Sequence, residues 1–474
     1  MSQNTNKPPA AASLRFDQGS LLLSGVGERE GRSFLAPQMW VWDDRVPAWR
    51  CHAMYYAAVS QALRGTLGQR LADEIAAPPS LAWREVKLPA LRPEQQDAIA
   101  AWRAADRRGQ IIMPTGTGKT EVALAAMAET GIATLIVAPV RDLMYQWHRR
   151  ILKAFGYDAG IVGDNIFNVR PVTVTTYDSA CIHMPRLGDR FGLIIFDEEH
   201  HLPGQFRRDA ALMSMAPMRM GLTATPERSD DRHKDLDYLI GPVVYSMPLR
   251  QAKGSTLADF DVVRIPVKLS DEEQAIYDQC SLAVRQFIHQ RQQDHKGYDW
   301  QDLCKESGRD PEARRAQKAY YAKRAIEDRA EEKLRVLEDI FRLHVGQRVI
   351  VFTGSNMMAM EISRRFLVPT ILSHTRKKER LAVLEGFAAE LFPVLVANQV
   401  LDEGVDVPEA KVAVVVGGLS STRQAKQRLG RILRRSGNMR AILYEVVCED
   451  TKEAERSRTR RRSDAYERTI HRRV

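Results

Sequence analysis

The sequence predicts an α/β protein with two parallel-sheet lobes in tandem, a small N-terminal α+β module and a helical insertion in the second lobe. Three observations predict this class. Short apolar runs alternate with helix-favouring stretches from residue 88 to 250, as in sheets with helices on both faces. The same alternation resumes with the apolar run 348–353. Between the two, residues 270–345 form long charged helical stretches that begin at a capping-box signature, Ser270 to Glu273.

These patterns divide the chain into five segments. Residues 1–12 are polar and rich in Ala and Pro, so we expect a disordered tail. The other segments are a compact module at 13–86, a first lobe at 88–250, a second lobe at 251–450 with its insertion at about 270–345, and an Arg-rich tail at 451–474.

The composition indicates a polyanionic partner. The 474 residues carry a formal net charge of +10, which fits nucleic acid, although many basic proteins bind none. No apolar run is long enough to span a membrane, and the N-terminus lacks an apolar signal core. The five cysteines have neither disulfide nor zinc spacing. We therefore expect a cytoplasmic protein without a membrane partner.

A glycine-rich loop joins an apolar run to a helix-favouring stretch. The run 110–113 predicts a buried strand, and the stretch 121–128 predicts a helix. This is the context of a phosphate-binding loop, although Met113 replaces the first Gly of the strict pattern. Backbone N–H groups around Gly116 and Gly118 would cradle the phosphates of ATP. Lys119 would reach the β and γ phosphates, and the Thr120 hydroxyl would coordinate Mg²⁺.

A second apolar run, 191–196, ends on two acidic residues, Asp197 and Glu198. Carboxylates at the end of a parallel strand lie in the crevice where α/β sheets bind ligands. We expect Asp197 to hold Mg²⁺ and Glu198 to orient or deprotonate the attacking water. The adjacent His200 and His201 have no further ligands at metal spacing, so packing or coupling is favoured over a metal site.

Together these motifs resemble those of superfamily 2 helicases and translocases. The resemblance extends to Gly-Leu-Thr-Ala-Thr-Pro at 221–226, to 398–408, which resembles motif V, and to 427–434, which resembles motif VI. It implies two RecA-like lobes, with arginine fingers Arg431 and Arg434 completing the ATP site on lobe closure. Gln95 would read the adenine, and Asp406 would lie near the ribose. The other site residues that the resemblance adds are Arg92, Thr115, Thr117, Gly404 and Gln427.

Within this superfamily, the chain resembles the XPB group of DNA helicases over residues 88–450. The features that carry this resemblance are Glu-Glu-His-His-Leu-Pro at 198–203 and Leu-Ile-Gly-Pro-Val-Val-Tyr at 239–245. The group has Arg-Glu-Asp where this chain has Arg-Ser-Asp at 228–230, which leaves strand separation in question. By the resemblance to superfamily 2, Arg141, Thr175 and Thr176 would contact nucleic acid, because 137–143 and 174–178 resemble its strand-contacting loops Ia and Ib. By the resemblance to the XPB group, Arg228 and Asp230 would do so too.

Two further segments resemble parts of XPB-like proteins. The module at 13–86 resembles a damage-recognition domain, which implies that Arg45 and Arg50 contact DNA; its tryptophans fit a role in the module core better than a role in stacking. The insertion resembles a thumb. Its aromatic residues among Lys and Arg would suit a grip on duplex DNA, or equally the solvated face of a charged helix.

The resemblance implies an ATP-dependent DNA helicase with 3′-to-5′ polarity and a role in DNA repair, using ATP and Mg²⁺. The residues themselves imply only a nucleic-acid-coupled ATPase. Two alternatives stay open: a duplex translocase that remodels protein–DNA complexes or serves anti-phage defence without separating strands, and a DNA-bound scaffold that recruits a nuclease. The sequence has no nuclease motif, so cutting would need a separate nuclease partner.

Overall fold

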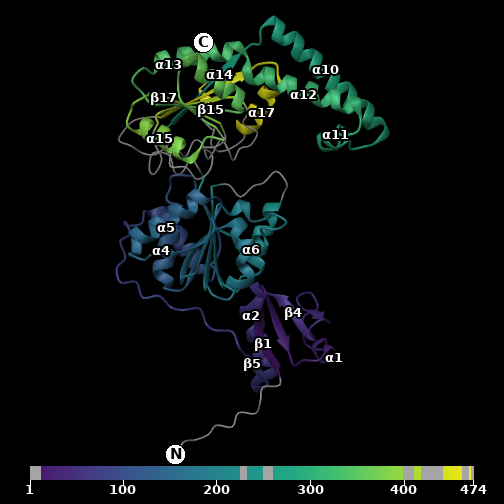
Figure 1. Ribbon diagram of the computed structural model, residues 1–474, viewed down its shortest axis with the longest axis vertical. Helices are drawn as coiled ribbons and strands as arrows, with labels where there is room; N and C mark the ends of the chain where they lie inside the picture. Colours follow the sequence, from purple (N-terminus) through teal and green to yellow (C-terminus); the bar gives the residue numbers. More distant parts are fainter. Residues whose placement is uncertain are drawn as a thin grey trace, which may run out of the picture. The chain divides into compact units, whose positions relative to one another are not determined.

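The computed structural model describes residues 12–224, 232–248, 260–372, 374–398, 410–417, 441–461 and 469–470. The chain divides into two compact units, residues 1–247 and 248–474 (Figure 1). No helix among these described residues is long and apolar enough to cross a membrane.

The first unit begins with a small five-stranded sheet in the order β3-β4-β2-β1-β5. Only β1 and β5 pair in parallel. Two of its tryptophans, Trp40 and Trp49, are buried in the module core, as expected, while Trp42 is partly buried against it. The strands are β1 Ala12–Asp17, β2 Ser20–Ser24, β3 Val41–Asp43, β4 Ala48–His52 and β5 Leu71–Asp73; the helices are α1 Glu28–Gly31 and α2 Tyr56–Leu67.

The rest of the first unit is an eight-stranded sheet in the order β13-β6-β12-β11-β7-β10-β8-β9, parallel except for the edge strand β9. Helices α4 and α5 lie on one face and α6 on the other (Figure 1). The strands are β6 Arg108–Ile112, β7 Thr134–Ala138, β8 Gly160–Gly163, β9 Ile166–Asn168, β10 Val172–Thr176, β11 Leu193–Asp197, β12 Met218–Thr223 and β13 Val243–Ser246. The helices are α3 Pro93–Ala104, α4 Lys119–Thr130, α5 Arg141–Phe155, α6 Tyr177–Leu187, α7 Asp209–Leu212 and α8 Leu236–Leu239.

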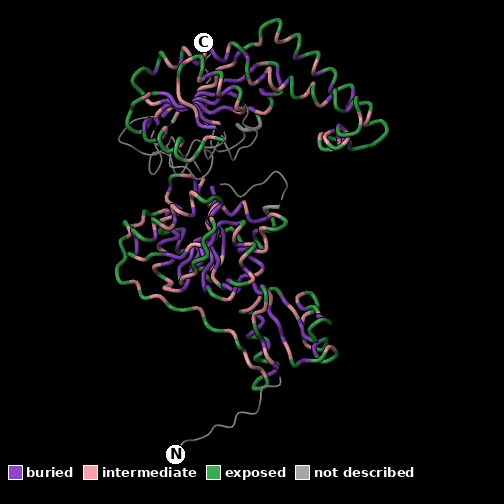
Figure 2. Tube along the Cα trace, viewed as in Figure 1, coloured by how far each residue is buried: buried purple, intermediate pink, exposed green. Residues whose placement is uncertain are grey.

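The second unit is built on a seven-stranded parallel sheet in the order β16-β17-β15-β18-β19-β14-β20. The inner strands of both large sheets are buried (Figure 2), whereas β9, at one edge of the first-lobe sheet, is exposed. The strands are β14 Phe260–Val267, β15 Val349–Thr353, β16 Thr370–Ile371, β17 Val394–Ala397, β18 Val412–Val416, β19 Ala441–Cys448 and β20 Thr469–Ile470. The helices beside the sheet are α13 Glu331–Leu343, α14 Asn356–Phe366, α15 Lys377–Ala388 and α17 Lys452–Arg461. The fold class is therefore confirmed: α/β, with two parallel-sheet lobes in tandem.

A helical arm projects from the second sheet. It consists of α10 Asp271–Asp294, α11 Trp300–Glu306 and α12 Pro311–Arg329, with α11 at the far end (Figure 1). The predicted capping box starts α10, because the Ser270 hydroxyl accepts from the backbone N–H of Glu273 and the Glu273 carboxylate accepts from that of Ser270. We call α10, α11 and α12 the thumb.

Candidate functional site

The glycine-rich loop lies between β6 and α4, at the carboxyl end of the first-lobe sheet. Gly116 and Gly118 have φ angles of +88° and +82°, a region that side chains with a Cβ seldom adopt. A Cβ on Gly118 would lie 2.3 Å from Nε2 of Gln95, so this position also requires glycine for space. Lys119 is buried, and its Nζ donates to the carbonyl oxygen of Met113 at 3.0 Å. The lysine is thus held within the loop that it would serve.

Two upstream residues brace this loop. The Gln95 Nε2 donates to the carbonyl oxygen of Thr117 at 2.9 Å, and its Oε1 accepts from the backbone N–H of Arg92 at 2.9 Å. The Arg92 guanidinium also donates to the Thr117 carbonyl. Gln95 was predicted to read adenine, but here both ends of its buried amide are bonded to the protein. The structure therefore gives Gln95 a loop-positioning role, and any contact with a base would require one of these bonds to exchange.

Asp197 ends β11, and two other elements hold it, one through its carboxylate and one through its backbone oxygen. Its Oδ2 accepts from Nε1 of Trp147 at 2.8 Å, and its backbone oxygen accepts from the Tyr177 hydroxyl at 3.0 Å. Burial, followed by the charge of Glu198, raises the pKa of Asp197 to about 6, while Trp147 and Lys119 oppose this shift. A carboxylate that is buried beside another acid is stabilised by a cation.

Glu198 is coupled to the next strand rather than left in a solvated loop. Its backbone lies in the left-handed region at φ +50°, an uncommon conformation for a non-glycine residue. The Thr223 hydroxyl, at the end of β12, lies 3.4 Å from the Glu198 carboxylate and 3.1 Å from Nδ1 of His200. No cluster suited to a metal ion of three or more His, Cys, Asp or Glu side chains occurs in the described part of the chain. Through its contact with Thr223, His200 is linked to the end of β12, and its Nδ1 lies 3.5 Å from the Glu198 carboxylate.

The side chains of this site fit Mg²⁺ and a nucleoside triphosphate. Mg²⁺ prefers oxygen ligands and takes few of them from the protein, and a carboxylate at Asp197 with a hydroxyl at Thr120 meets that preference. The Thr115 hydroxyl is buried without a hydrogen-bond partner among the described residues, whereas that of Thr117 donates to the Pro114 carbonyl at 2.7 Å. Lys119 is close enough to Asp197 to influence its pKa. Because β12 lies between β6 and β11 and pairs in parallel with both, the loop after β6 and the acids after β11 lie at the same edge of the sheet.

Three neighbours of this site were not singled out from the sequence. Trp147 and Thr223 reach it from α5 and β12. No local pattern marks Trp147, and Thr223 lies in the motif at 221–226, for which no role at this site was predicted. Glu199 is fully buried, with neither carboxylate oxygen hydrogen-bonded within the described residues. Burial, together with the charges of Glu198 and Asp237, raises the pKa of Glu199 well above its usual range. Its oxygen occupies the space where a Cβ on Gly221 would lie.

Two of the residues predicted to contact nucleic acid have hydroxyls that bond within the protein. Thr175 is fully buried, and its hydroxyl donates to the Val162 carbonyl at 2.7 Å. Thr176 caps α6 by accepting from the backbone N–H of Ser179 at 3.3 Å. Both hydroxyls thus hold the fold together and are not displayed for a ligand. Arg141 is exposed and pairs with Asp164 at 2.7 Å, so it stays a candidate.

In the N-terminal module, the two predicted arginines share one carboxylate. Arg45 and Arg50 both bind Asp43, at 2.9 and 2.7 Å, and Arg50 also pairs with Asp17 at 2.8 Å. The Arg45 side chain is 84% exposed and that of Arg50 only 25%. Arg45 can therefore reach a ligand, whereas Arg50 is a brace between strands.

Seven predicted residues lie outside the described parts of the chain. They are Arg228 and Asp230, after the first-lobe strand β12, and Gly404, Asp406, Gln427, Arg431 and Arg434 in the second lobe.

Family models match three parts of the chain. Residues 14–70 match the xeroderma pigmentosum group B helicase damage recognition domain. Residues 88–228 match the type III restriction enzyme res subunit, and residues 317–464 match the ERCC3/RAD25/XPB C-terminal helicase.

Curated relatives agree with these models. The chain is 40% identical over 372 residues to the DNA 3′-5′ translocase XPB2 of Sulfurisphaera tokodaii. This match spans 78% of this chain and 84% of the relative. It is 32% identical over 390 residues to the DNA 3′-5′ helicase XPB of Kineococcus radiotolerans, and 31% identical over 369 residues to that of Mycobacterium tuberculosis. The matches span 79% and 75% of this chain, and 62% and 60% of those two relatives.

Solved structures support the fold. The helicase domain of Hef from Pyrococcus furiosus superposes with a TM-score of 0.52 at 17% identity, over 77% of this chain and 98% of that domain. A fragment of a putative HsdR subunit of a type I restriction enzyme from Vibrio vulnificus gives 0.52 at 21% identity, over 77% of this chain and 65% of the fragment.

Proposed function

The chain belongs to the XPB family of superfamily 2 DNA helicases, and we propose that it couples ATP hydrolysis to 3′-to-5′ movement along DNA, opening or remodelling DNA in repair. The observation that supports the proposal is the parallel order β6-β12-β11, which brings the loop that carries Lys119 and the acids Asp197 and Glu198 to the same edge of the sheet. The sequence has no nuclease motif, so any cutting of DNA would need a separate nuclease partner.

The side chains divide the chemistry among them. Lys119 exchanges its bond to the Met113 carbonyl for phosphate oxygens. Asp197 and Thr120 would hold Mg²⁺, which would neutralise charge on the phosphates. Glu198 orients the attacking water and accepts its proton, and Thr223 and His200 fix the position of that carboxylate. Arg431 and Arg434 supply positive charge from the second lobe.

Steady-state ATP hydrolysis tests the proposal, measured without nucleic acid and with single-stranded DNA, duplex DNA, forked DNA or RNA. We expect stimulation by DNA and not by RNA. Glu198→Gln should lower kcat by about 10²- to 10⁴-fold, the usual effect of losing a general base. Lys119→Ala should lower kcat by about 10²- to 10³-fold, since it removes a charge aimed at the transferred group.

The matched control is Lys153→Ala, which removes an exposed lysine of the same lobe and should leave turnover unchanged. Wild-type turnover in the Lys119 or Glu198 variant would refute the site. Equal stimulation by RNA would refute the DNA assignment.

A second candidate, duplex translocation without strand separation, is favoured by one observation. The relative at 40% identity is named a translocase. A duplex translocase would hydrolyse ATP on blunt duplex DNA and displace a bound third strand, yet leave a tailed duplex intact.

A further inference from the structure

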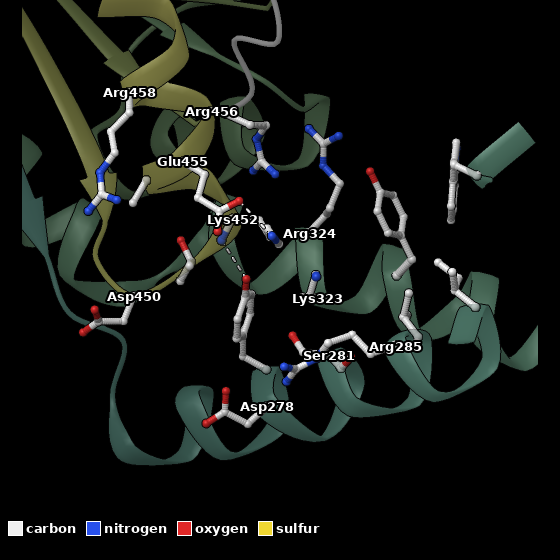
Figure 3. Close-up of a pocket in the computed structure, with 17 residues that line it drawn as sticks. Asp278, Ser281, Arg285, Lys323, Arg324, Asp450, Lys452, Glu455, Arg456 and Arg458 are labelled. Atoms are coloured by element: carbon white, nitrogen blue, oxygen red, sulfur yellow. Dashed lines mark hydrogen bonds and ion pairs between the residues drawn. The ribbon is translucent and has the colours of Figure 1, made fainter. Parts of the chain in front are cut away.

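A pocket of about 770 Å³ lies in the second unit, between the thumb and α17 (Figure 3). Side chains of α10 and α12 form one wall, and residues 450–458 form the other. Six cationic and three acidic side chains line it. Its size falls within the range of small-molecule sites, roughly 300–1,000 Å³.

Lys323 of α12 is the buried cation of this pocket. It is only 8% exposed, and its Nζ lies 5.5 Å from the centre of the Tyr277 ring. No carboxylate forms an ion pair with it in the described part of the chain. Glu327, the nearest acid on the same helix, is engaged by the Tyr277 hydroxyl at 3.0 Å and by Arg456. Lys323 therefore contributes to the pocket lining a positive charge that pairs with no carboxylate of the described residues, which suits an anionic ligand.

Other positive charges lie around Lys323. Burial lowers the pKa of Lys323, and the positive charges of Lys452, Arg456 and Arg285 lower it further, against the opposing effect of Glu327. Lys452 is neutralised by Glu455 at 2.8 Å, and Arg456 by Glu327. Arg285 bonds only to the Ser281 carbonyl, at 3.3 Å, among the described residues. Figure 3 shows Arg285 and Lys323 on the thumb side, facing Lys452 and Arg456 of α17.

Aromatic rings lie next to these cations. Trp300 of α11 and Tyr320 of α12 line the pocket, with ring centroids 3.9 Å apart. Tyr320 lies one helical turn from Arg324, which also lines the pocket. Aromatic faces beside cations are the combination that binds nucleotides, by stacking on the base and by contact with the phosphate.

We propose that this pocket is a second nucleotide-binding site, in which Lys323 and Arg285 bind a phosphate and Trp300 with Tyr320 stacks on the base. The ligand is either a free nucleotide or one unit of a nucleic-acid strand, which share this chemistry. In the strand form the inference rests on the proposed function, since it gives the thumb a defined hold on DNA.

Titration calorimetry on the full chain tests this inference, with thymidine 5′-monophosphate as the first probe. That probe lacks the adenine for which the first-lobe site is predicted. Thymidine, inorganic phosphate, and oligo(dT) with and without a 5′-phosphate complete the series. We expect saturable binding of thymidine 5′-monophosphate or of oligo(dT), and at least about tenfold weaker binding of thymidine, since the contact to phosphate is charge-assisted.

Two variants and one control locate the binding. Lys323→Met keeps the length of the side chain and removes the buried charge, so it should fold at least as stably as the wild type in a thermal melt. This variant should bind the phosphorylated probe at least about tenfold more weakly than the wild type. Trp300→Ala should weaken binding of the same probe, because the ring that stacks on the base is lost. Lys318→Met, at an exposed position of the same helix, should change nothing.

The outcomes separate cleanly. Binding of the mononucleotide indicates a free nucleotide, and binding of oligo(dT) alone indicates a strand. Absence of saturable binding, binding unaffected by Lys323→Met, or a preference for an oligo-glutamate peptide would overturn the inference. A chain that binds these probes without DNA-stimulated ATP hydrolysis would refute the proposed function and leave this pocket in place. The reverse result would refute the pocket alone.

Discussion

At the scale of single residues, Gly118 shows how backbone angle and available space act together. Its φ of +82° disfavours any side chain, and a Cβ would meet Gln95 at 2.3 Å. Gly118→Ala should therefore displace the Gln95 amide from the loop and raise KM for ATP at least about tenfold, as one lost contact to a charged ligand does. Steady-state kinetics measure this change.

A matched glycine separates strain from crowding. Gly156, which ends α5, has φ +60°, but no heavy atom outside its neighbours lies within 4 Å of its ideal Cβ. Gly156→Ala should cost about 1–2 kcal/mol in stability and leave KM unchanged. An equal rise of KM in both variants would contradict the role of Gln95.

Arg45 and Arg50 share Asp43 but differ in exposure, which predicts different effects of their removal. Arg50→Ala should lower the melting temperature of the chain, because the 25%-exposed Arg50 also binds Asp17 and Ser20. Arg45→Ala should leave the melting temperature almost unchanged, because exposed pairs contribute little. If Arg45 contacts DNA, its removal should weaken duplex affinity, measured by fluorescence anisotropy. Unchanged affinity would exclude Arg45 from the interface.

The same pairs predict an acid dependence of this module. Hydrogen bonds from Arg45 and then Arg50 hold the pKa of Asp43 well below its usual range. The stabilisation is thus complete above the unfolded pKa, near 4, and is lost as the pH falls below it. In thermal melts between pH 5 and pH 3, the melting temperature should fall more steeply for the wild type than for Asp43→Asn.

At the scale of elements, a buried ion pair fixes α13 to α17. Nζ of Lys333 lies 2.7 Å from the Glu453 carboxylate, and both side chains are almost fully buried. Lys333→Ala would leave Glu453 buried without its counter-charge, at an expected cost of about 3–5 kcal/mol. The double variant Lys333→Met with Glu453→Leu should recover much of this loss. Hydrogen exchange of α13 and α17 in urea measures the loss of stability in the single variant and its recovery in the double variant.

The exposed pair on the same helix is the control. Arg335 and Glu332 are 3.0 Å apart, with side chains 65% and 43% exposed. Arg335→Ala should cost at most about 1 kcal/mol. A similar cost for both single variants would show that burial does not set the strength of the α13–α17 joint.

The elements of the site that a local pattern defines could be predicted from the sequence. The strand, loop and helix around Lys119, the strand ending at Asp197, and the cap at Ser270 each depend on neighbouring residues. Contacts that depend on the order of strands in the sheet could not be predicted from the sequence. Trp147 meets Asp197 across 50 residues because β7 and β11 are adjacent, and Thr175 is buried because β10 lies inside the sheet. The cluster around Lys323 likewise requires α10, α12 and α17 to converge.

At the scale of the whole molecule, the open question is whether hydrolysis separates strands or only moves the protein along a duplex. Strand displacement on duplexes with a 3′ or a 5′ single-stranded tail answers it. A 3′-to-5′ helicase loads on a 3′ tail, so we expect displacement from that substrate and not from the 5′-tailed one.

The control for this experiment is Glu198→Gln, because displacement that survives without hydrolysis would reflect trapping of frayed strands rather than movement. If both tailed duplexes stay intact while duplex DNA still stimulates ATP hydrolysis, the result contradicts unwinding and favours the translocase. Such a result would agree with Ser229, which stands where the XPB group has glutamate. Ser229→Glu should then restore displacement on the 3′-tailed duplex without raising ATP turnover, since the change lies outside the phosphate-binding residues. Failure of that substitution would place the determinant of strand separation elsewhere in the chain.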